Sequence, residues 1–210
     1  PARLNMALDI LMSAIEFWAW FEKQAVRFAA LRDMPEEAAL NEIQDRLHAY
    51  CEHLWFEIGG APDGPMEFII SAEGNERYFS EVSELANAAP HVPGWNIIPF
   101  KPAHGFDFVT TYEGVRLDPK CCWFLPLTSA REPGRVGLRV GVPCYVAGNA
   151  ETIKSGLYIV ADAGLGELVS GQRIAFIEVC ELPADPEQDG FIRLSELGDY
   201  IAWISRRTDV

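Results

Sequence analysis

Two adjacent cysteines, Cys121 and Cys122, are the side chains of this chain best suited to nucleophilic chemistry. A thiolate attacks a carbonyl carbon when a neighbouring base takes its proton, and His104 or His91 would be that base, with Asp107 orienting the imidazole. Along a strand, alternation turns one cysteine of such a pair inward and the other outward, whatever the function. A hydrolase or transferase of small molecules built on Cys122, His104 and Asp107 is therefore our alternative hypothesis and not the first one.

The segment 185–196 has the acidic spacing of an EF-hand calcium loop. The first, third, fifth and twelfth positions of such a loop are held by Asp185, Glu187, Asp189 and Glu196. Gly190 falls at the sharp turn, but the third position holds Glu where Asp or Asn is usual, and Pro186 stands at the second. The preceding residues 176–183 also have a strand pattern where an EF-hand needs a helix. We expect an acidic surface loop that leads into the last helix, and no bound metal.

A second set of possible metal ligands is His48, Cys51 and His53. His48 and Cys51 share a helix face, but zinc needs two further ligands, and no other pair has matching spacing. We favour a half-buried Cys51, with both histidines near the last carbonyl groups of the helix. The sequence lacks the P-loop, H-E-x-x-H, G-x-S-x-G and C-x-x-C motifs, and the glycines at 164 and 166 follow a helix pattern instead of opening one. No cofactor is predicted.

Apolar residues at three- and four-residue spacing predict the helices that must position these groups. A capping box of Ser13 and Glu16 begins the first helix, which runs to about Leu31, and Asp33 and Pro35 begin a second one, to about residue 50. Further helices are predicted over about 79–89, from about 150, and from about 197. Two helices therefore lead the chain.

Segments with period-two patterns predict the strands. They are residues 54–59, 66–72, 95–100 and 106–112, then 122–127, 135–142 and 173–179. The last segment is almost continuously apolar, which is typical of a central strand. We predict an α+β fold: an antiparallel or mixed sheet from two strand-strand-helix-strand units, with helices on one face. The chain is predicted to be a single domain of residues 1–210, or two halves, about 54–112 and 121–181, that share one sheet.

Large aromatic residues on the apolar faces of these elements are expected to lie buried in one shared core. They are Trp18, Phe21, Phe56, Phe68, Trp95 and Phe176.

Composition limits the partners. Seventeen Lys and Arg against 31 Asp and Glu give the 210 residues a formal charge of -14, which disfavours nucleic acid and anionic membranes, because both are bound through basic surfaces. No apolar run reaches the length of a membrane helix, and residues 1–10 lack the pattern of a signal peptide. With five cysteines and no Asn-x-Ser/Thr sequon, we expect a cytoplasmic protein.

The sequence resembles a family of uncharacterised bacterial proteins in stretches that span most of the chain. They are FWAWF (17–21), FEIG (56–59), EFIISAEGN (67–75), AP followed by GWNIIPFKP (94–102), and LYIVADAGLGE (157–167). The family has no established activity. The resemblance implies a cytoplasmic α+β protein without a recognised catalytic signature.

In the absence of a catalytic motif, the acidic surplus points to a non-enzymatic protein that acts through protein contacts, of the inhibitor, immunity-protein or regulator type. Residues 160–199 hold nine Asp and Glu against two Arg, a local charge of -7. Asp185, Glu187 and Asp189 are the predicted interaction residues, facing a basic protein. A generally acidic proteome would give the same charge without a partner.

Overall fold

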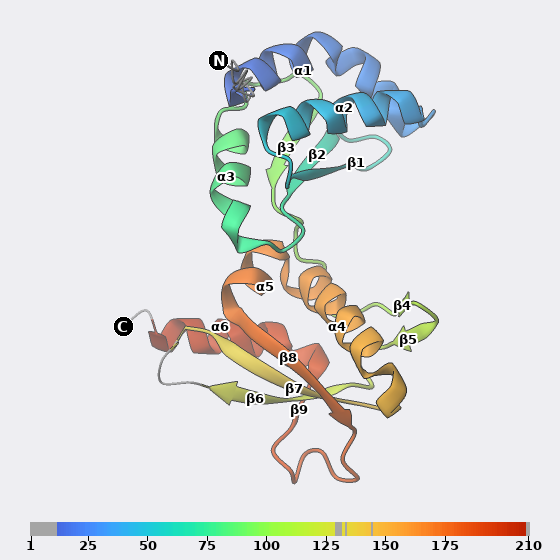
Figure 1. Ribbon diagram of the computed structural model, residues 1–210, viewed down its shortest axis with the longest axis vertical. Coiled ribbons are helices and arrows are strands. Elements are labelled where there is room, and N and C mark those ends of the chain that lie inside the picture. Colours follow the sequence, from blue (N-terminus) through green and yellow to red (C-terminus); the bar gives the residue numbers. More distant parts are fainter. Residues whose placement is uncertain (1–11, 129–131, 133, 144, 209–210) are drawn as a thin grey trace, which may run out of the picture. The chain divides into compact units, whose positions relative to one another are not determined.

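The computed structural model describes residues 12–128, 132, 134–143 and 145–208. Both helices and short strands occur along this part of the chain (Figure 1), which confirms the α+β class and the two N-terminal helices. The helices are α1 (Ala14–Ala29), α2 (Glu37–Tyr50), α3 (Phe79–Asn87), α4 (Ala150–Leu165), α5 (Glu167–Arg173) and α6 (Leu197–Thr208). The strands are β1 (Trp55–Gly59), β2 (Met66–Ser71), β3 (Trp95–Pro99), β4 (Thr110–Tyr112), β5 (Val115–Leu117), β6 (Trp123–Thr128), β7 (Val136–Val142), β8 (Ile174–Glu181) and β9 (Ile192–Arg193).

The chain divides into two compact units, residues 1–100 and 101–210. The first unit has the sheet β1-β2-β3, and the second has the sheet β8-β7-β6-β9 and the hairpin β4-β5. Among the described residues, no strand of one unit pairs with a strand of the other. The two halves therefore do not share one sheet; each builds its own.

Both units use the predicted strand-strand-helix-strand order with the same pairing. β1 is antiparallel to β2, and after α3 the chain returns as β3, parallel to β2. Likewise β6 is antiparallel to β7, and after α4 and α5 the chain returns as β8, parallel to β7. Each sheet is mixed because a short connection can join antiparallel strands, whereas a parallel return needs a longer crossover, here a helical one.

The helix α1 begins at the predicted capping box. The Glu16 N–H donates to the Ser13 hydroxyl at 3.3 Å, and the Ser13 N–H donates to the Glu16 carboxylate at 2.8 Å. The Ser13 N–H and the Ser13 hydroxyl both donate to the Glu16 carboxylate, which favours its ionised form and so lowers the pKa of Glu16. With this start, the aromatic stripe of α1 packs on β2 and β3: the Phe21 ring lies 4.9 Å from that of Phe68 and 5.1 Å from that of Trp95.

The predicted aromatic core is confirmed in the first unit and wrong for Phe176. Trp18, Phe21, Phe68 and Trp95 are buried, and Phe56 is half-buried with its ring stacked on Phe68. Phe176, in the second unit, is 41% exposed. Its ring lies over Gly137 of the neighbouring strand β7, where any side chain would collide with it, so the ring covers the outer face of the sheet.

The core of the second unit lies between its sheet and the helices α4 and α6. Leu138 of β7 and Ile177 of β8 join Ile153 of α4 and Ile201 of α6 in one buried cluster. Gly164 of α4 lies against the ring of Phe106, and this approach requires a residue without a side chain. No helix of the described residues is long and apolar enough to cross a membrane.

Within the described residues, β8 is an edge strand of its sheet, so the prediction of a central strand over 173–179 is wrong. Its apolar residues serve two faces: Ile177 faces the core and Phe176 faces outward. On its open edge, the Ile177 N–H donates to the Tyr158 hydroxyl of α4 at 3.1 Å. The helix thus blocks part of an edge that would otherwise accept another strand.

Three short strands depart from the prediction. Of the expected strand over 106–112, only β4 forms, and β5 and β9 were not predicted. Strands of two or three residues contain too few positions for a period-two pattern to be recognised.

Candidate functional site

The predicted thiol site has one buried member and two exposed ones. Cys122 is 2% exposed and lies in the core of the second unit, whereas Cys121 is exposed, and both cysteines precede β6, which begins at Trp123. His104 and Asp107 are exposed on the segment before β4, and His91 is exposed in the first unit. A Cys122 thiol would have to leave the core to meet a substrate, because only an accessible thiolate reacts.

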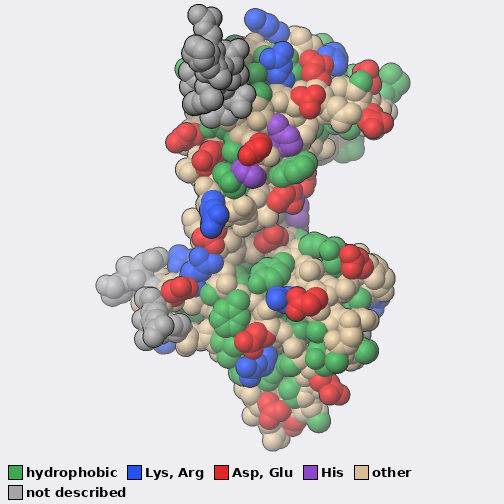
Figure 2. All heavy atoms as spheres, viewed as in Figure 1, with side chains coloured by type: hydrophobic (Ala, Val, Ile, Leu, Met, Phe, Trp, Pro, Cys, Tyr) green, Lys and Arg blue, Asp and Glu red, His purple; other side chains and the backbone are tan. Residues whose placement is uncertain are grey.

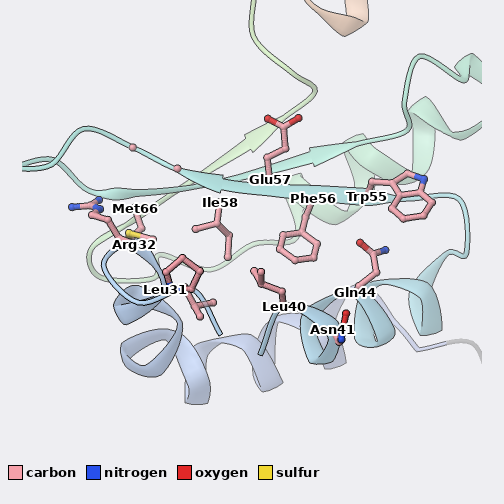
Figure 3. Close-up of a pocket in the computed structure, with 13 residues that line it drawn as sticks. Leu31, Arg32, Leu40, Asn41, Gln44, Trp55, Phe56, Glu57, Ile58 and Met66 are labelled. Atoms are coloured by element: carbon pink, nitrogen blue, oxygen red, sulfur yellow. The ribbon is translucent and has the colours of Figure 1, made fainter. Parts of the chain in front are cut away.

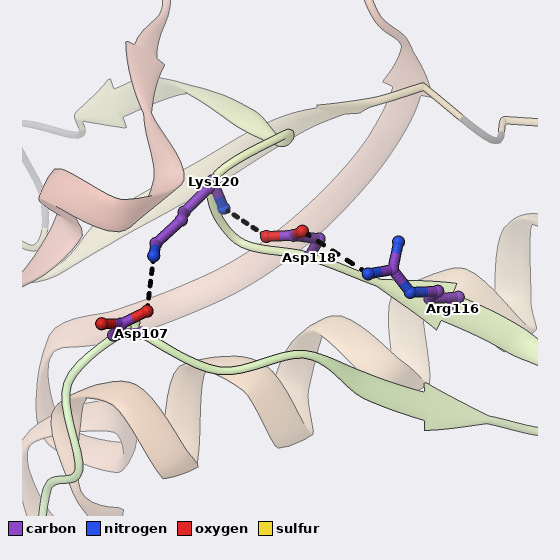
Figure 4. A network of polar contacts seen from close by, with 4 residues as sticks. All are labelled: Asp107, Arg116, Asp118 and Lys120. Carbon is purple, nitrogen blue, oxygen red and sulfur yellow. Dashed lines mark hydrogen bonds and ion pairs between the residues drawn. The ribbon is translucent and has the colours of Figure 1, made fainter.

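Asp107 belongs to a surface network (Figure 4). The Lys120 ammonium lies 2.5 Å from its carboxylate, which lowers the pKa of Asp107 and raises that of Lys120, since the pair favours both charged forms. The Lys120 N–H donates to Asp118 at 3.0 Å, and Arg116 lies 3.8 Å from the same carboxylate. The Asp107 and Lys120 side chains are 88% and 61% exposed, so water screens this pair. Orientation of His104 by Asp107 stays a prediction.

The acidic loop, residues 182–191, connects β8 with β9 and projects away from the helices at the lower end of Figure 1. The Gln188 N–H donates to the Asp185 carboxylate at 3.2 Å, and the Asp189 N–H donates to the Asp185 carbonyl at 3.1 Å. Gly190 turns the chain with φ near 80°. The loop is therefore closed by its own turns.

The carboxylates of the calcium-like pattern point to solvent and do not gather around an ion. Asp185, Glu187, Asp189 and Glu196 are all exposed. No three His, Cys, Asp or Glu side chains of the described residues are grouped as metal ligands. In Figure 2, acidic side chains gather over the tip of the loop.

The histidines near Cys51 pack against aromatic rings. The His48 ring lies edge-on to Trp55 at 5.1 Å, and the His53 ring stacks on Tyr78 at 4.1 Å. These contacts replace the helix carbonyl groups that we expected as their partners. Cys51 is half-buried as predicted, and this burial raises the pKa of its thiol.

The outer face of the second sheet, opposite to α4 and α6, is apolar and has no helix over it in the described residues. Trp123, Leu125 and Leu127 of β6 are half-buried on this face, and the register aligns Leu127, Gly137 and Phe176 in one row across three strands. None of these apolar residues belongs to the buried core cluster. An exposed apolar area of this kind is typical of a protein contact surface.

Charged side chains surround and cross this outer face. Arg139 and Glu178 form an ion pair at 3.0 Å between β7 and β8, and the Arg193 guanidinium lies 4.6 Å above the Trp123 ring. Both contacts join neighbouring strands. The face thus combines apolar side chains with charged side chains whose partners lie on the neighbouring strand.

The acidic loop borders the outer face. A side chain at Gly141 of β7 would meet Leu182 and Pro183 at 3.2 Å, and one at Gly190 would meet Leu125 of β6 at 3.7 Å. The loop therefore lies against the same sheet face that carries the apolar residues. Together they form an apolar surface with an acidic rim.

Sequence reasoning missed this outer face and one buried carboxylate. The pattern of residues 122–127 held a usable signal, since apolar side chains on both sides of a strand indicate two apolar faces. Glu167, counted above in the acidic surplus, is fully buried; its carboxylate accepts the Lys101 N–H at 3.1 Å, and its own N–H donates to the Lys101 carbonyl at 3.0 Å. No pattern in the sequence indicates that contact.

Comparison with known proteins adds no relative: no family model, curated protein or solved structure matches the chain. The resemblance to a family of uncharacterised bacterial proteins stays a prediction.

Proposed function

We propose that this protein is a non-enzymatic interaction protein of the inhibitor, immunity-protein or regulator type, whose second unit binds a basic protein. The observation that carries the proposal is the acidic loop lying along the uncovered apolar face of the β8-β7-β6-β9 sheet. The apolar face supplies buried area, and Asp185, Glu187 and Asp189 supply the charge that selects the partner.

The apolar residues and the carboxylates contribute differently to binding, because the two kinds of interaction differ in strength. Apolar side chains such as Phe176, Trp123 and Leu127 gain free energy when a partner removes them from water. Exposed carboxylates contribute little affinity at physiological salt, but they speed association with a positive surface and disfavour acidic competitors. A basic partner with an apolar centre fits both features.

The test is selection from a display library of peptides rich in Lys, Arg, Leu and Trp, at physiological salt, with the full chain as bait. Binders are then compared for the parent, for the loop variant Asp185→Asn/Glu187→Gln/Asp189→Asn, and for Phe176→Thr. We expect the loop variant to slow association and Phe176→Thr to speed dissociation, each by about tenfold.

A matched control separates the loop from bulk charge. The triple variant Asp33→Asn/Glu36→Gln/Glu37→Gln removes three exposed charges from the first unit and should leave binding unchanged. Equal losses in both triple variants would contradict the proposal, because only net charge would then matter. Concentration-dependent dimers in sedimentation that disappear in Phe176→Thr would identify a second copy as the occupant, and would also contradict it.

A further inference from the structure

A groove in the first unit lies between the helix α2 and the strand β1 (Figure 3). Its volume is about 820 Å³, within the range of sites that hold ligands. From α2 it is lined by Leu40, Asn41 and Gln44, and from β1 by Phe56 and Ile58. The sequence patterns gave no sign of this groove, and the interaction proposed for the second unit does not use it.

The wall formed by β1 is the edge of a sheet. β1 pairs with β2 on one side, and no described strand lies on its other side. Its five residues offer roughly 17 Å of strand edge along the groove, at about 3.3 Å per residue. An extended peptide can extend such a sheet by backbone hydrogen bonds.

The apolar side chains of the groove have the spacing of a strand. Phe56 and Ile58, two residues apart, are half-buried and point toward α2, and Leu40 reaches up between them (Figure 3). A peptide strand beside β1 would place every second side chain over this apolar floor. The groove therefore selects apolar residues at alternate positions.

One end of the groove carries the cation Arg32, which forms no ion pair with a carboxylate of the described residues. Arg32 donates to the carbonyl groups of Pro62 at 2.8 Å and Gly64 at 3.1 Å, and its Nε is buried with no hydrogen-bond partner in the described residues. Both partners are neutral. In a chain of charge -14, a guanidinium held in this way is a specific place for an anion.

The Arg32 end of the groove also sets where an added peptide strand must end. Arg32 fixes the turn between β1 and β2 through those two carbonyl groups, and Gly59 and Gly60 line the groove there. A side chain at Gly59 would meet nothing within 4 Å, so the space beside the end of β1 is open. A peptide that ends here leaves its terminal carboxylate beside Arg32.

We propose that the groove between α2 and β1 binds the C-terminal segment of another protein as an added strand on β1, with apolar side chains at alternate positions and the terminal carboxylate at Arg32. The carboxylate supplies the counter-charge that Arg32 lacks, and the apolar side chains cover Phe56, Ile58 and Leu40.

The probe is a display library of random hexapeptides with free C termini, selected on the full chain. Enriched sequences are synthesised with a fluorescein label, once as the free acid and once as the C-terminal amide, and measured by fluorescence polarisation. We expect enrichment of apolar residues at alternate positions and a loss of about tenfold or more in affinity for the amide.

Variants then locate the site. Arg32→Gln should abolish the preference for the acid, while Arg32→Lys should retain part of it. Leu40→Glu should weaken both peptides, and Asn41→Trp, at an exposed position that lines the groove, should block binding without touching the core. Val26→Glu, at a position 90% exposed on α1, is the matched control and should change nothing.

Hydrogen exchange gives an independent readout, since an added strand should slow exchange in β1. Lack of enrichment, equal affinity of acid and amide, or binding that survives Asn41→Trp would each overturn the proposal. Enriched peptides that bind equally well with residues added after the last position would show that a side-chain carboxylate, and not a C terminus, is recognised, and would also overturn it.

Discussion

The carboxylate of Glu167 shows how burial changes the meaning of a charged residue. It was counted as part of an acidic surface, yet Glu167 is fully buried: its carboxylate accepts the Lys101 N–H, and its backbone N–H donates to the Lys101 carbonyl. A buried carboxylate is costly unless hydrogen bonds replace its water. Its role is to fix the first residues of the second unit to the turn between α4 and α5.

Glu167→Ala should therefore destabilise the second unit by about 1 to 3 kcal/mol, because the Lys101 N–H loses its acceptor. Glu167→Gln keeps an acceptor oxygen of the same size and should recover part of this loss. Hydrogen exchange of the Lys101 amide, with urea unfolding of each variant, measures the effect. Equal behaviour of the two variants would show that the charge matters and the hydrogen bond does not.

At the scale of elements, α1 shows how one helix anchors a unit. Its capping box sets where the helix begins, and its aromatic stripe then falls on β2 and β3. The Phe21 ring lies within 6.2 Å of five other aromatic rings, those of Phe17, Trp18, Phe28, Phe68 and Trp95. Such a cluster holds the helix against the sheet by buried area and ring geometry together.

Shortening a side chain of α1 should lower stability strongly on the buried side of the helix and hardly at all on the exposed side. Phe21→Ala removes a fully buried ring and should cost about 3 to 5 kcal/mol, since the lost contacts leave a cavity. Val26→Ala, on the exposed side of the same helix, should change stability by less than about 0.5 kcal/mol. Thermal unfolding of both variants measures these changes in stability. Similar losses of stability in the two variants would mean that α1 does not anchor the core.

At the scale of the whole molecule, the negative net charge lowers the stability of the fold. A formal charge of -14 creates repulsion among exposed carboxylates, and the acidic loop concentrates three of them within five residues. The carboxylates proposed to bind a partner therefore lower the free energy of unfolding.

The loop variant Asp185→Asn/Glu187→Gln/Asp189→Asn should melt at a slightly higher temperature than the parent in low salt. The gain should be about 0.5 kcal/mol or less, because these residues are exposed. It should shrink in 0.1 M salt, where charges are screened beyond about 10 Å. Calorimetry at the two salt concentrations provides the measurement; a lower melting temperature would assign the carboxylates a structural role instead.

Local patterns in the sequence determined the elements. The Ser13–Glu16 capping box, the aromatic stripe of α1 and the alternation in β1, β2 and β7 each depend on residues close in the chain, so their period revealed them. One buried and one exposed cysteine was also the prediction for Cys121 and Cys122, although both precede β6 and Cys121 lies in a turn instead of a strand. The order of elements repeated in the two halves followed from those assignments.

Tertiary structure alone decided which edges and outer faces of the sheets stay uncovered. The sequence of β8 does not reveal that it is an edge strand, because an apolar strand has the same pattern whether it pairs on one edge or on both. The outer face with Phe176, the contact of Glu167 with Lys101 and the groove beside Arg32 all join residues far apart in the chain. Such contacts are set by packing among distant elements, and no local pattern encodes them.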